Sequence, residues 1–321
     1  MVTKKIIIIT GVAGMVGTNL LKKLINEKNS IIIGIDSLIL GKKKFLAPYL
    51  NNKNFFFIKL DLSKKIKSKK IEKIIGQNML SEVWMLAANS DIKKGVDDCY
   101  IDINNTFLTT VNTLNLLKNY LTKKTKIIFT SSSAVYGNIK KITSENKQKL
   151  LPISNYGSMK LSSESFLSSF SHSSQLNIFI FRFPNVIGNN LTHGVFYDMK
   201  NKIKNKKNFI KVLGNGEQQK PYSHVDEILE CILYIKNKKH LEKLNYYNIG
   251  SNDSGVKVKK IVELMVKKLN SNKKIIYQKK SYGWIGDVPK YKYLTTKTNK
   301  TGFKFKLSSI EVVEKVIKDN I

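Results

Sequence analysis

The first half of the chain alternates short apolar runs with longer amphipathic stretches. Six runs predict strands: residues 5–9, 31–35, 55–58, 82–87, 126–130 and 177–181. Their continuous apolar character is typical of strands that are covered on both faces. Helix-period patterns fill the gaps, for example at residues 15–27 and 106–120. Strands that alternate with helices in this way predict βαβ units and a parallel sheet.

The rhythm changes after residue 183. Residues 189–221 are rich in Asn, Gly and Lys and predict loops with one helix near residues 196–204. Further elements are expected beyond them: helices near residues 225–235, 258–269 and 308–319, and strands near residues 246–249 and 274–277. The pattern predicts an α/β fold, a Rossmann-type doubly wound sheet formed by residues 1–182 plus 222–250. A smaller C-terminal substrate-binding lobe would contain residues 183–221 plus 251–321.

A glycine-rich turn follows the first predicted strand. Gly11, Gly14 and Gly17 have the G-x2-G-x2-G spacing and stand between a strand and a helix. A bound phosphate needs backbone amides that approach closely, a helix N-terminus that faces it, and no Cβ in the way. The turn therefore predicts a dinucleotide site that includes the neighbouring residues Met15 and Val16.

An acidic residue ends the second predicted strand. Asp36 lies about 20 residues past the glycines, where a carboxylate accepts hydrogen bonds from a ribose diol and repels a 2′-phosphate. This position favours NAD over NADP. The basic run at residues 42–44 would soften that preference.

The ends of the next two predicted strands extend the cofactor site. Asp61 and Leu62 follow the third strand, where the acid would meet the adenine amino group or, alternatively, cap a helix. Leu86, Ala87 and Ala88 end the fourth strand. Small side chains there would let a flat cofactor lie against the backbone, or would simply pack at the end of the strand.

Three side chains further along form a possible catalytic set. Tyr156 and Lys160 are one helical turn apart, on the same face of a predicted helix. A phenol has a reference pKa of about 10, so Tyr156 needs the Lys160 ammonium and the charge of an oxidised nicotinamide to act as a base near neutral pH. The serine run at residues 131–133 would orient a substrate hydroxyl, whereas alone it would indicate only a turn.

Charge does not change this picture. The 321 residues carry a net charge of +33, a value that often indicates a nucleic-acid or membrane partner. The lysines are spread along the whole chain without a basic-aromatic motif, so we expect no nucleic-acid partner. Arg182 is the only arginine. Its place at the end of a core strand indicates a role that needs a planar group with several hydrogen-bond donors, which lysine lacks. Alternatively, this arginine was retained by chance.

Cysteine usage and hydropathy bear on the compartment. Cys99 and Cys231 have no metal-ligand spacing, so we expect no metal site and a reduced, cytoplasmic environment. The apolar run at residues 6–9 is too short for the core of a signal sequence, and no segment approaches a membrane-spanning length. A soluble protein without a membrane partner is expected.

Together these motifs resemble the extended short-chain dehydrogenase/reductase family, in particular its NAD-dependent epimerase/dehydratase group, which acts on nucleotide sugars. The resemblance covers nearly the whole chain and also rests on residues 131–137, 152–157, 182–186 and 222–226. It implies NAD as the cofactor and Ser132 as the catalytic hydroxyl, with Ser133 as the adjacent alternative. It also implies a homodimer formed through the helices at residues 109–117 and 156–170.

The residues after the catalytic hydroxyl separate the reactions of this family. By resemblance, dehydratases carry an acidic pair and decarboxylases a Glu where this chain has Ser133 and Ala134. Elimination therefore lacks the acid that protonates a leaving hydroxyl. Epimerisation needs only oxidation, rotation of the keto sugar and return of the hydride. The resemblance implies an enzyme like UDP-glucose 4-epimerase, with Ser132 and Ser133 at the sugar and a transient 4-keto sugar.

The lobe that would bind the nucleotide sugar departs from the family pattern. Asn185 matches a position that contacts the diphosphate, but Lys220 and Trp284 stand where the pattern has arginines. Lys220, Lys279 or Lys280 would supply the missing charge. Trp284 would stack on a base or sugar, or pack in the core.

Two other interpretations remain open. A reductase or dehydratase of the same family, or an enzyme that epimerises at C3, would use the same cofactor site. A non-catalytic NAD-binding module would need only that site, and the complete set of Ser132, Tyr156 and Lys160 argues against it.

Overall fold

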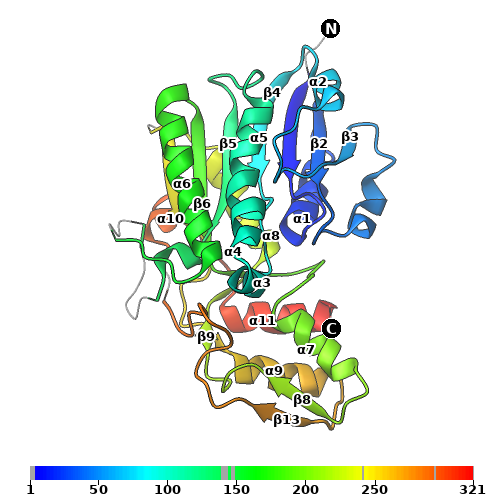
Figure 1. Ribbon diagram of the computed structural model, residues 1–321, viewed down its shortest axis with the longest axis vertical. Coiled ribbons are helices and arrows are strands. Elements are labelled where there is room, and N and C mark those ends of the chain that lie inside the picture. The colour runs from blue at the N-terminus through cyan, green and yellow to red at the C-terminus, as the bar shows by residue number, and fades with distance from the viewer. Residues whose placement is uncertain (1–3, 139–143, 146–148, 241, 293, 321) are drawn as a thin grey trace.

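The computed structural model describes residues 4–138, 144–145, 149–240, 242–292 and 294–320. Its upper part in Figure 1 is a seven-stranded parallel sheet. The strands are β1 (Lys5–Thr10), β2 (Ser30–Asp36), β3 (Phe55–Lys59), β4 (Met79–Met85), β5 (Lys126–Ser132), β6 (Asn177–Phe183) and β11 (Leu244–Asn248). Their order in the sheet is β11-β6-β5-β4-β1-β2-β3. The predicted Rossmann-type α/β fold is confirmed.

The strand order reverses beside β1. This strand pairs in parallel with β2 on one side and with β4 on the other, so that Ile8 lies between Ile33 and Val83. Ligands of doubly wound sheets bind outside the carboxyl ends of the strands at such a reversal. The glycine turn at residues 10–17 follows β1 and therefore lies at this point.

Both faces of the sheet are covered by helices. Ile7 and Ile9 pack into the core on one face, and Ile6 and Ile8 pack into the core on the other. The first face carries α1 (Met15–Leu24) and α8 (Val225–Lys236), and the second carries α2 (Lys69–Ile75), α5 (Thr109–Leu117) and α6 (Asn155–Ser174) (Figure 1). Burial on both faces explains the continuous apolar strands, because each buried isoleucine stabilises the fold by about 1.5–3 kcal/mol.

The lower part in Figure 1 has a core of its own, which includes Phe196, Ile210, Ile261, Met265 and Val313. Its helices are α7 (Val195–Lys204), α9 (Val258–Lys268) and α11 (Ser309–Asn320). Its strands form pairs: β7 (Asn185–Ile187) with β10 (Tyr222–His224), β8 (Phe209–Val212) with β13 (Lys274–Tyr277), and β9 (Gln219–Lys220) with β12 (Val256–Lys257).

The remaining helices are short and connect the larger elements. They are η1 (Lys43–Tyr49), α3 (Ile92–Asp97), α4 (Cys99–Asp102), the π-helix η2 (Ile103–Leu108), η3 (Ser133–Tyr136) and α10 (Thr296–Lys300). No helix of the described residues is both long enough and apolar enough to cross a membrane.

Two sequence predictions differ from the structure. The helix expected at residues 106–120 is instead the end of η2 followed by α5. The prediction of loops and one helix for residues 189–221 is wrong at β8, where Ile210 and Val212 are buried and the alternate residues Phe209 and Lys211 are exposed. Its partner β13 begins more than 60 residues later, so nothing local in this Lys- and Asn-rich stretch indicates the pairing.

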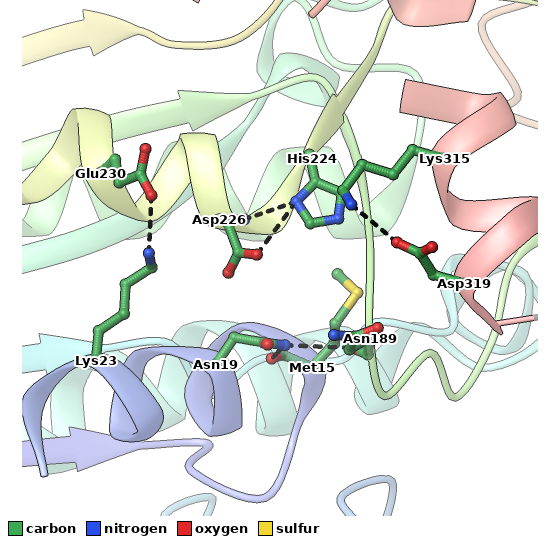
Figure 2. A network of polar contacts seen from close by, with 9 residues as sticks. All are labelled: Met15, Asn19, Lys23, Asn189, His224, Asp226, Glu230, Lys315 and Asp319. Atoms are coloured by element: carbon green, nitrogen blue, oxygen red, sulfur yellow. Dashed lines mark hydrogen bonds and ion pairs between the residues drawn. The ribbon is translucent and has the colours of Figure 1, made fainter. Parts of the chain in front are cut away.

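Polar contacts join the upper and lower parts where α1, α8 and α11 meet (Figure 2). The Asn19 amide on α1 donates to the carbonyl oxygens of Met15 at 2.9 Å and of Asn189 at 3.1 Å. His224 caps α8, because its Nδ1 accepts a hydrogen bond from the Asp226 backbone at 3.3 Å. Burial lowers the pKa of His224 and so favours the neutral ring that this cap requires. The sequence motif at residues 222–226 thus has a structural role.

Candidate active site

A cavity of about 470 Å³ lies along the carboxyl ends of β1, β2, β4 and β5. It is lined by every residue that the sequence assigned to the cofactor or to catalysis, namely Gly11, Gly14, Met15, Val16, Gly17, Asp36, Asp61, Leu62, Leu86, Ala87, Ala88, Ser132, Tyr156 and Lys160. The predicted substrate residues Ser133, Asn185 and Lys220 lie outside this lining. The fold therefore brings residues from across the first half of the chain to one edge of the sheet.

The glycine turn has little room for side chains. Gly11 has a φ of +71°, and a Cβ there would lie 2.9 Å from the Ala87 backbone nitrogen. A Cβ on Gly17 would overlap the carbonyl oxygen of Gly11 and lie 2.7 Å from the Cα of Val12. Gly14 is less confined, since its Cβ would come only within 3.3 Å of that same oxygen.

Helix α1 begins directly after Gly14. No side chain caps it, and its first turn carries no acidic residue. The amides at its N-terminus and the helix dipole favour an anion at this point. The shape of the turn and the donors of the helix therefore fit the pyrophosphate of a dinucleotide.

Asp36 ties the glycine turn to the end of β2. Its carboxylate accepts hydrogen bonds from the backbone of Ala13 at 2.9 Å and from the backbone of Leu38 at 2.8 Å. Burial raises the pKa of Asp36, and the two hydrogen bonds lower it. Each oxygen accepts one hydrogen bond from the protein and has a further lone pair for a ribose hydroxyl.

Asp61 and Leu62 lie at the far end of the cavity from Tyr156 along the sheet. The Asp61 carboxylate accepts a hydrogen bond from the backbone of Ser63 at 3.0 Å, in a local turn. Helix α2 begins only at Lys69, so Asp61 does not cap it. The Asn112 amide donates to the carbonyl oxygen of Leu62 at 2.9 Å and holds this loop against α5.

The end of β4 is held close to the glycine turn. The Thr10 hydroxyl accepts hydrogen bonds from the backbone nitrogens of Leu86 and Ala87, both at 3.2 Å. Strand β4 is Met79–Met85, so it ends two residues before the predicted strand at residues 82–87. Leu86 and Ala87 are therefore loop residues whose backbone is fixed beside Gly11.

Tyr156, Lys160 and Ser132 come together at the other end of the cavity. Ser132 ends β5, and Tyr156 lies in the first turn of α6, which Ser154 caps through a 3.1 Å hydrogen bond from the Gly157 backbone. The hydroxyls of Ser132 and Tyr156 are hydrogen-bonded to each other. The Nζ atom of Lys160 lies 5.8 Å from the centre of the Tyr156 ring.

Burial dominates the acidity of this cluster. It lowers the pKa of Lys160 to about 7, and the nearby charge of Glu164 opposes that shift. It raises the pKa of Tyr156 above its usual range, while the hydrogen bond from Ser132 lowers it and the charge of Asp102 raises it. Without a cofactor the phenol is therefore protonated at neutral pH. The expected acidification needs a further positive charge beside the ring.

Two of the predicted substrate residues converge on one tyrosine. Ser133 donates a hydrogen bond to the Tyr291 hydroxyl at 3.2 Å, and the Asn185 amide donates to the same oxygen at 3.4 Å. Asn185 also donates to the carbonyl oxygen of Pro221 at 3.3 Å. Ser133 and Asn185 are thus brought together, but by a residue that no sequence motif indicated.

Lys220 lies in a mixed charged and aromatic cluster. Its ammonium pairs with the Asp287 carboxylate and lies 5.1 Å from the centre of the Trp284 ring. Asp287 also accepts a hydrogen bond from the Gly283 backbone at 2.9 Å. Lys220 and Trp284, which occupy the two positions where the family pattern has arginines, therefore stack on each other.

Several residues that line the cavity were not found from the sequence. They include Thr109, Ser90, Lys94 and Thr192, whereas Asn105 and His193, which also line the cavity, were indicated by the sequence. Most belong to short or irregular elements, the π-helix η2 and the loops after β4 and β7, where no fixed spacing marks a ligand. The signal for Asn105 came from the family resemblance, because the family's Asn-x2-Gly-Thr helix motif is replaced at residues 109–113 and Asn105 would supply the missing asparagine.

Known proteins share both the sequence and the fold. A model of the NAD dependent epimerase/dehydratase family matches residues 7–250. A putative UDP-glucose 4-epimerase of Methanocaldococcus jannaschii is 26% identical over 285 residues, which cover 86% of this chain and 87% of that protein.

Two solved structures superpose over almost their whole length. A UDP-glucose 4-epimerase of Thermotoga maritima with UDP-glucose is 25% identical, with a TM-score of 0.81 and coverage of 98% of this chain and 97% of that one. A UDP-N-acetylglucosamine 4-epimerase of Methanobrevibacter ruminantium M1 in complex with UDP-N-acetylmuramic acid is 25% identical, with a TM-score of 0.81 and coverage of 99% and 98%.

The family match runs through the whole seven-stranded sheet and ends just after β11. It therefore includes the glycine turn, Asp36 and the cluster around Tyr156. The protein belongs to the NAD dependent epimerase/dehydratase family.

Proposed function

We propose that the protein is an NAD-dependent epimerase that inverts C4 of a nucleotide-diphosphate sugar, as a UDP-glucose 4-epimerase does. The observation that carries this proposal is the hydrogen-bonded pair of Ser132 and Tyr156, with Lys160 beside it, at one end of a cavity that begins at the glycine turn. Relatives and structural neighbours that are named as UDP-sugar 4-epimerases support it.

The cofactor would lie along the cavity. The amides that open α1 would hold its pyrophosphate, and Asp36 its ribose, while Asp61 and Leu62 would border the adenine. When bound there, NAD would supply a reversible acceptor for the hydride at C4 of the sugar.

Tyr156 would act as the acid and base of the reaction. As a phenolate it takes the proton of the sugar 4-hydroxyl. As a phenol it returns that proton after the transient 4-keto sugar has rotated to present its other face. The Lys160 ammonium stabilises the phenolate, and the Ser132 hydroxyl orients the substrate oxygen. Each of these side chains is fixed by the end of β5 or the start of α6, so the geometry is preset.

The side chains after the catalytic serine favour epimerisation over dehydration. Ser133 and Ala134 carry no acid, and the Ser133 hydroxyl is directed at Tyr291. A leaving hydroxyl would lack a proton donor there. A reductase or dehydratase of the same family is the alternative.

The nucleotide diphosphate would bind beside Asn185 and Lys220. Lys220 is held by Asp287 and supported by the ring of Trp284, so its ammonium is oriented before a substrate arrives. A single lysine offers one point charge and no bidentate fork, which makes this subsite weaker than one with two arginines. The strongly basic surface adds a long-range attraction for the anion.

The wider organisation is part of the proposal. Residues 1–182 plus 222–250 would bind NAD, and residues 183–221 plus 251–321 would bind the nucleotide sugar. A cytoplasmic homodimer formed through α5 and α6 is expected from the family resemblance.

A panel of UDP-, dTDP-, GDP- and CDP-sugars tests the proposal. The purified protein is incubated with each sugar without added cofactor, and the products are separated by chromatography. Conversion of one sugar to its C4 epimer, with no net NADH, is the expected result. Net NADH formation or loss of water from the sugar would instead identify the alternative.

A further inference from the structure

A buried polar network lies directly behind the proposed catalytic residues. Glu164 and Arg182 form a two-pronged ion pair, with Arg182 Nε donating to Glu164 Oε1 at 3.0 Å and Nη2 donating to Oε2 at 2.6 Å. The Ser131 hydroxyl also donates to Glu164 Oε1, at 2.5 Å. Glu164 is 2% exposed and Arg182 4% exposed, so both charges are removed from water.

The guanidinium of Arg182 is enclosed by aromatic rings. It lies 5.0 Å from the centre of the Tyr136 ring and 5.3 Å from that of Tyr246. Its Nη1 also donates to the Tyr136 hydroxyl at 2.9 Å, and that hydroxyl donates to Asn248 at 2.8 Å. Planar stacking together with several directed hydrogen bonds is possible for arginine and not for lysine. The only arginine of the chain therefore has a role that needs its fork.

One face of α6 meets the end of β5 at three successive turns. Tyr156 bonds the Ser132 hydroxyl, Lys160 donates to the carbonyl oxygen of Thr130 at 2.6 Å, and Glu164 accepts from the Ser131 hydroxyl. The three residues of α6 are four apart and so lie in one line along the helix. The strand end that carries Ser132 is thus held by the proposed catalytic pair and by Glu164, all from the same face of α6.

We propose that Glu164, oriented by Arg182, is a positioning residue that keeps the buried Lys160 ammonium charged and fixes the Ser131–Ser132 end of β5. This inference rests on the proposed function, because it acts through Lys160 and Ser132. The charge of Glu164 favours the protonated form of Lys160 against the cost of burial. A carboxylate one helical turn away stabilises the ammonium, and the two-pronged pair with Arg182 holds that carboxylate in place.

The charges around Lys160 set the expected pH dependence. Tyr156 and Glu164 face it from α6, and Arg182 on β6 stands behind Glu164. From β5 it meets only the Thr130 carbonyl and the Phe129 ring, 4.6 Å away. The phenols of Tyr136 and Tyr246 interact electrostatically with the Glu164–Arg182 pair, and the charge of Asp102 raises the pKa of Tyr156.

Three variants test the inference in the NAD-loaded protein. Loss of the Lys160 proton ends activity at high pH, so the alkaline limb of the kcat profile reports its pKa. Glu164→Gln removes the favourable charge and should move this limb down by about one pH unit. Arg182→Gln removes the positive charge beside Glu164, so the alkaline limb should move to higher pH. The double variant, which restores neutrality behind the site, should lie between the wild type and Glu164→Gln.

A purely structural role predicts a different result. It would lower kcat and the melting temperature in all three variants while leaving the alkaline limb in place, and that outcome would overturn the inference. If neither single variant folds, the neutral double variant still tests the inference. The inference requires its alkaline limb to lie at a lower pH than that of the wild type.

Two further variants separate the possible failures. Glu230→Gln breaks an exposed ion pair, 3.0 Å long, between Glu230 on α8 and Lys23 on α1, and should leave the limb unchanged (Figure 2). Tyr156→Phe tests the proposed function itself. An inactive Tyr156→Phe with an unmoved Glu164→Gln limb would refute this inference alone, whereas an active Tyr156→Phe would refute the function.

Discussion

The Nζ atom of Lys160 lies 2.6 Å from the carbonyl oxygen of Thr130, within a site where the lysine is 2% exposed. Thr130 also bonds the neighbouring strand, because its hydroxyl donates to the Met85 carbonyl at 3.3 Å. The proposed catalytic lysine is therefore held by the backbone of the sheet. The spacing on α6 sets its position beside Tyr156, and the pairing of β4 and β5 sets the carbonyl that its ammonium meets.

Replacing the phenol should abolish turnover while leaving the fold intact. We expect Tyr156→Phe to lower kcat by about 10²–10⁴, the usual contribution of a positioned acid or base. Ser132→Ala keeps the base but loses its hydrogen bond, so a smaller loss is expected. Epimer formation is measured by chromatography, with NAD affinity by calorimetry as the control. Equal losses of activity and NAD binding would point to misfolding instead.

Lys160 should make stability depend on pH. Its pKa is about 7 in the folded protein, against 10.5 as a reference, so the unfolded chain binds the extra proton between these values. Stability from this group therefore rises with pH above 7. Relative to Lys160→Met, the wild type should gain about 1–3 kcal/mol from pH 6 to pH 9. Urea unfolding at both pH values measures this, and a constant difference would contradict the low pKa.

Two glycines of the same turn should respond differently to alanine. Gly17→Ala drives a Cβ into the Gly11 carbonyl, so we expect a destabilisation of about 1–3 kcal/mol or more. Gly14→Ala meets only a 3.3 Å contact and should fold, yet it places a methyl group where the pyrophosphate would lie. Thermal unfolding separates the first variant and NAD titration the second. Wild-type NAD affinity in Gly14→Ala would argue against the proposed pose.

Asp36 should control cofactor choice. In Asp36→Asn the amide group can accept only one of the two backbone hydrogen bonds from Ala13 and Leu38, and the charge that repels a 2′-phosphate is lost. We expect NAD affinity to fall about tenfold and the ratio of NADP to NAD affinity to rise. Calorimetric titration with both cofactors provides the measurement. Asp61→Asn is the control and should leave the ratio unchanged.

Lys220 should affect the substrate and not the cofactor. Lys220→Met removes the proposed diphosphate cation and leaves Asp287 without its partner, so KM for the active nucleotide sugar should rise about tenfold or more. Lys279→Met is a matched control on the neighbouring segment. Steady-state kinetics with NAD-loaded protein measures both. If only the Lys279 variant raises KM, that lysine supplies the charge instead.

Local motifs carried most of what could be predicted. The glycine turn, Asp36 and the Tyr156–Lys160 pair each depend on spacing within one strand–turn–helix unit, and the structure places all of them on one cavity. Contacts between distant segments left no such signal. Ser133 meets Tyr291 across 158 positions, and Lys220 meets Asp287 across 67.

Arg182 shows the same limit at a single position. As the only arginine in a lysine-rich chain it indicated a role for a planar side chain, but retention by chance explained it equally well. The partners that decide the question lie on α6, η3 and β11, and only the folded sheet brings them together. Long-range pairing of this kind is fixed by packing and not by residue spacing.

Asn19 gives the cofactor turn a mechanical connection to the rest of the molecule. One amide group holds both the Met15 carbonyl, where α1 opens toward the cavity, and the Asn189 carbonyl, on the chain that leads into the lower part. A shift of the lower part would therefore be transmitted to the amides at the start of α1, which are proposed to bind the pyrophosphate. Asn19 is thus one of the contacts through which the position of the lower part affects the start of α1.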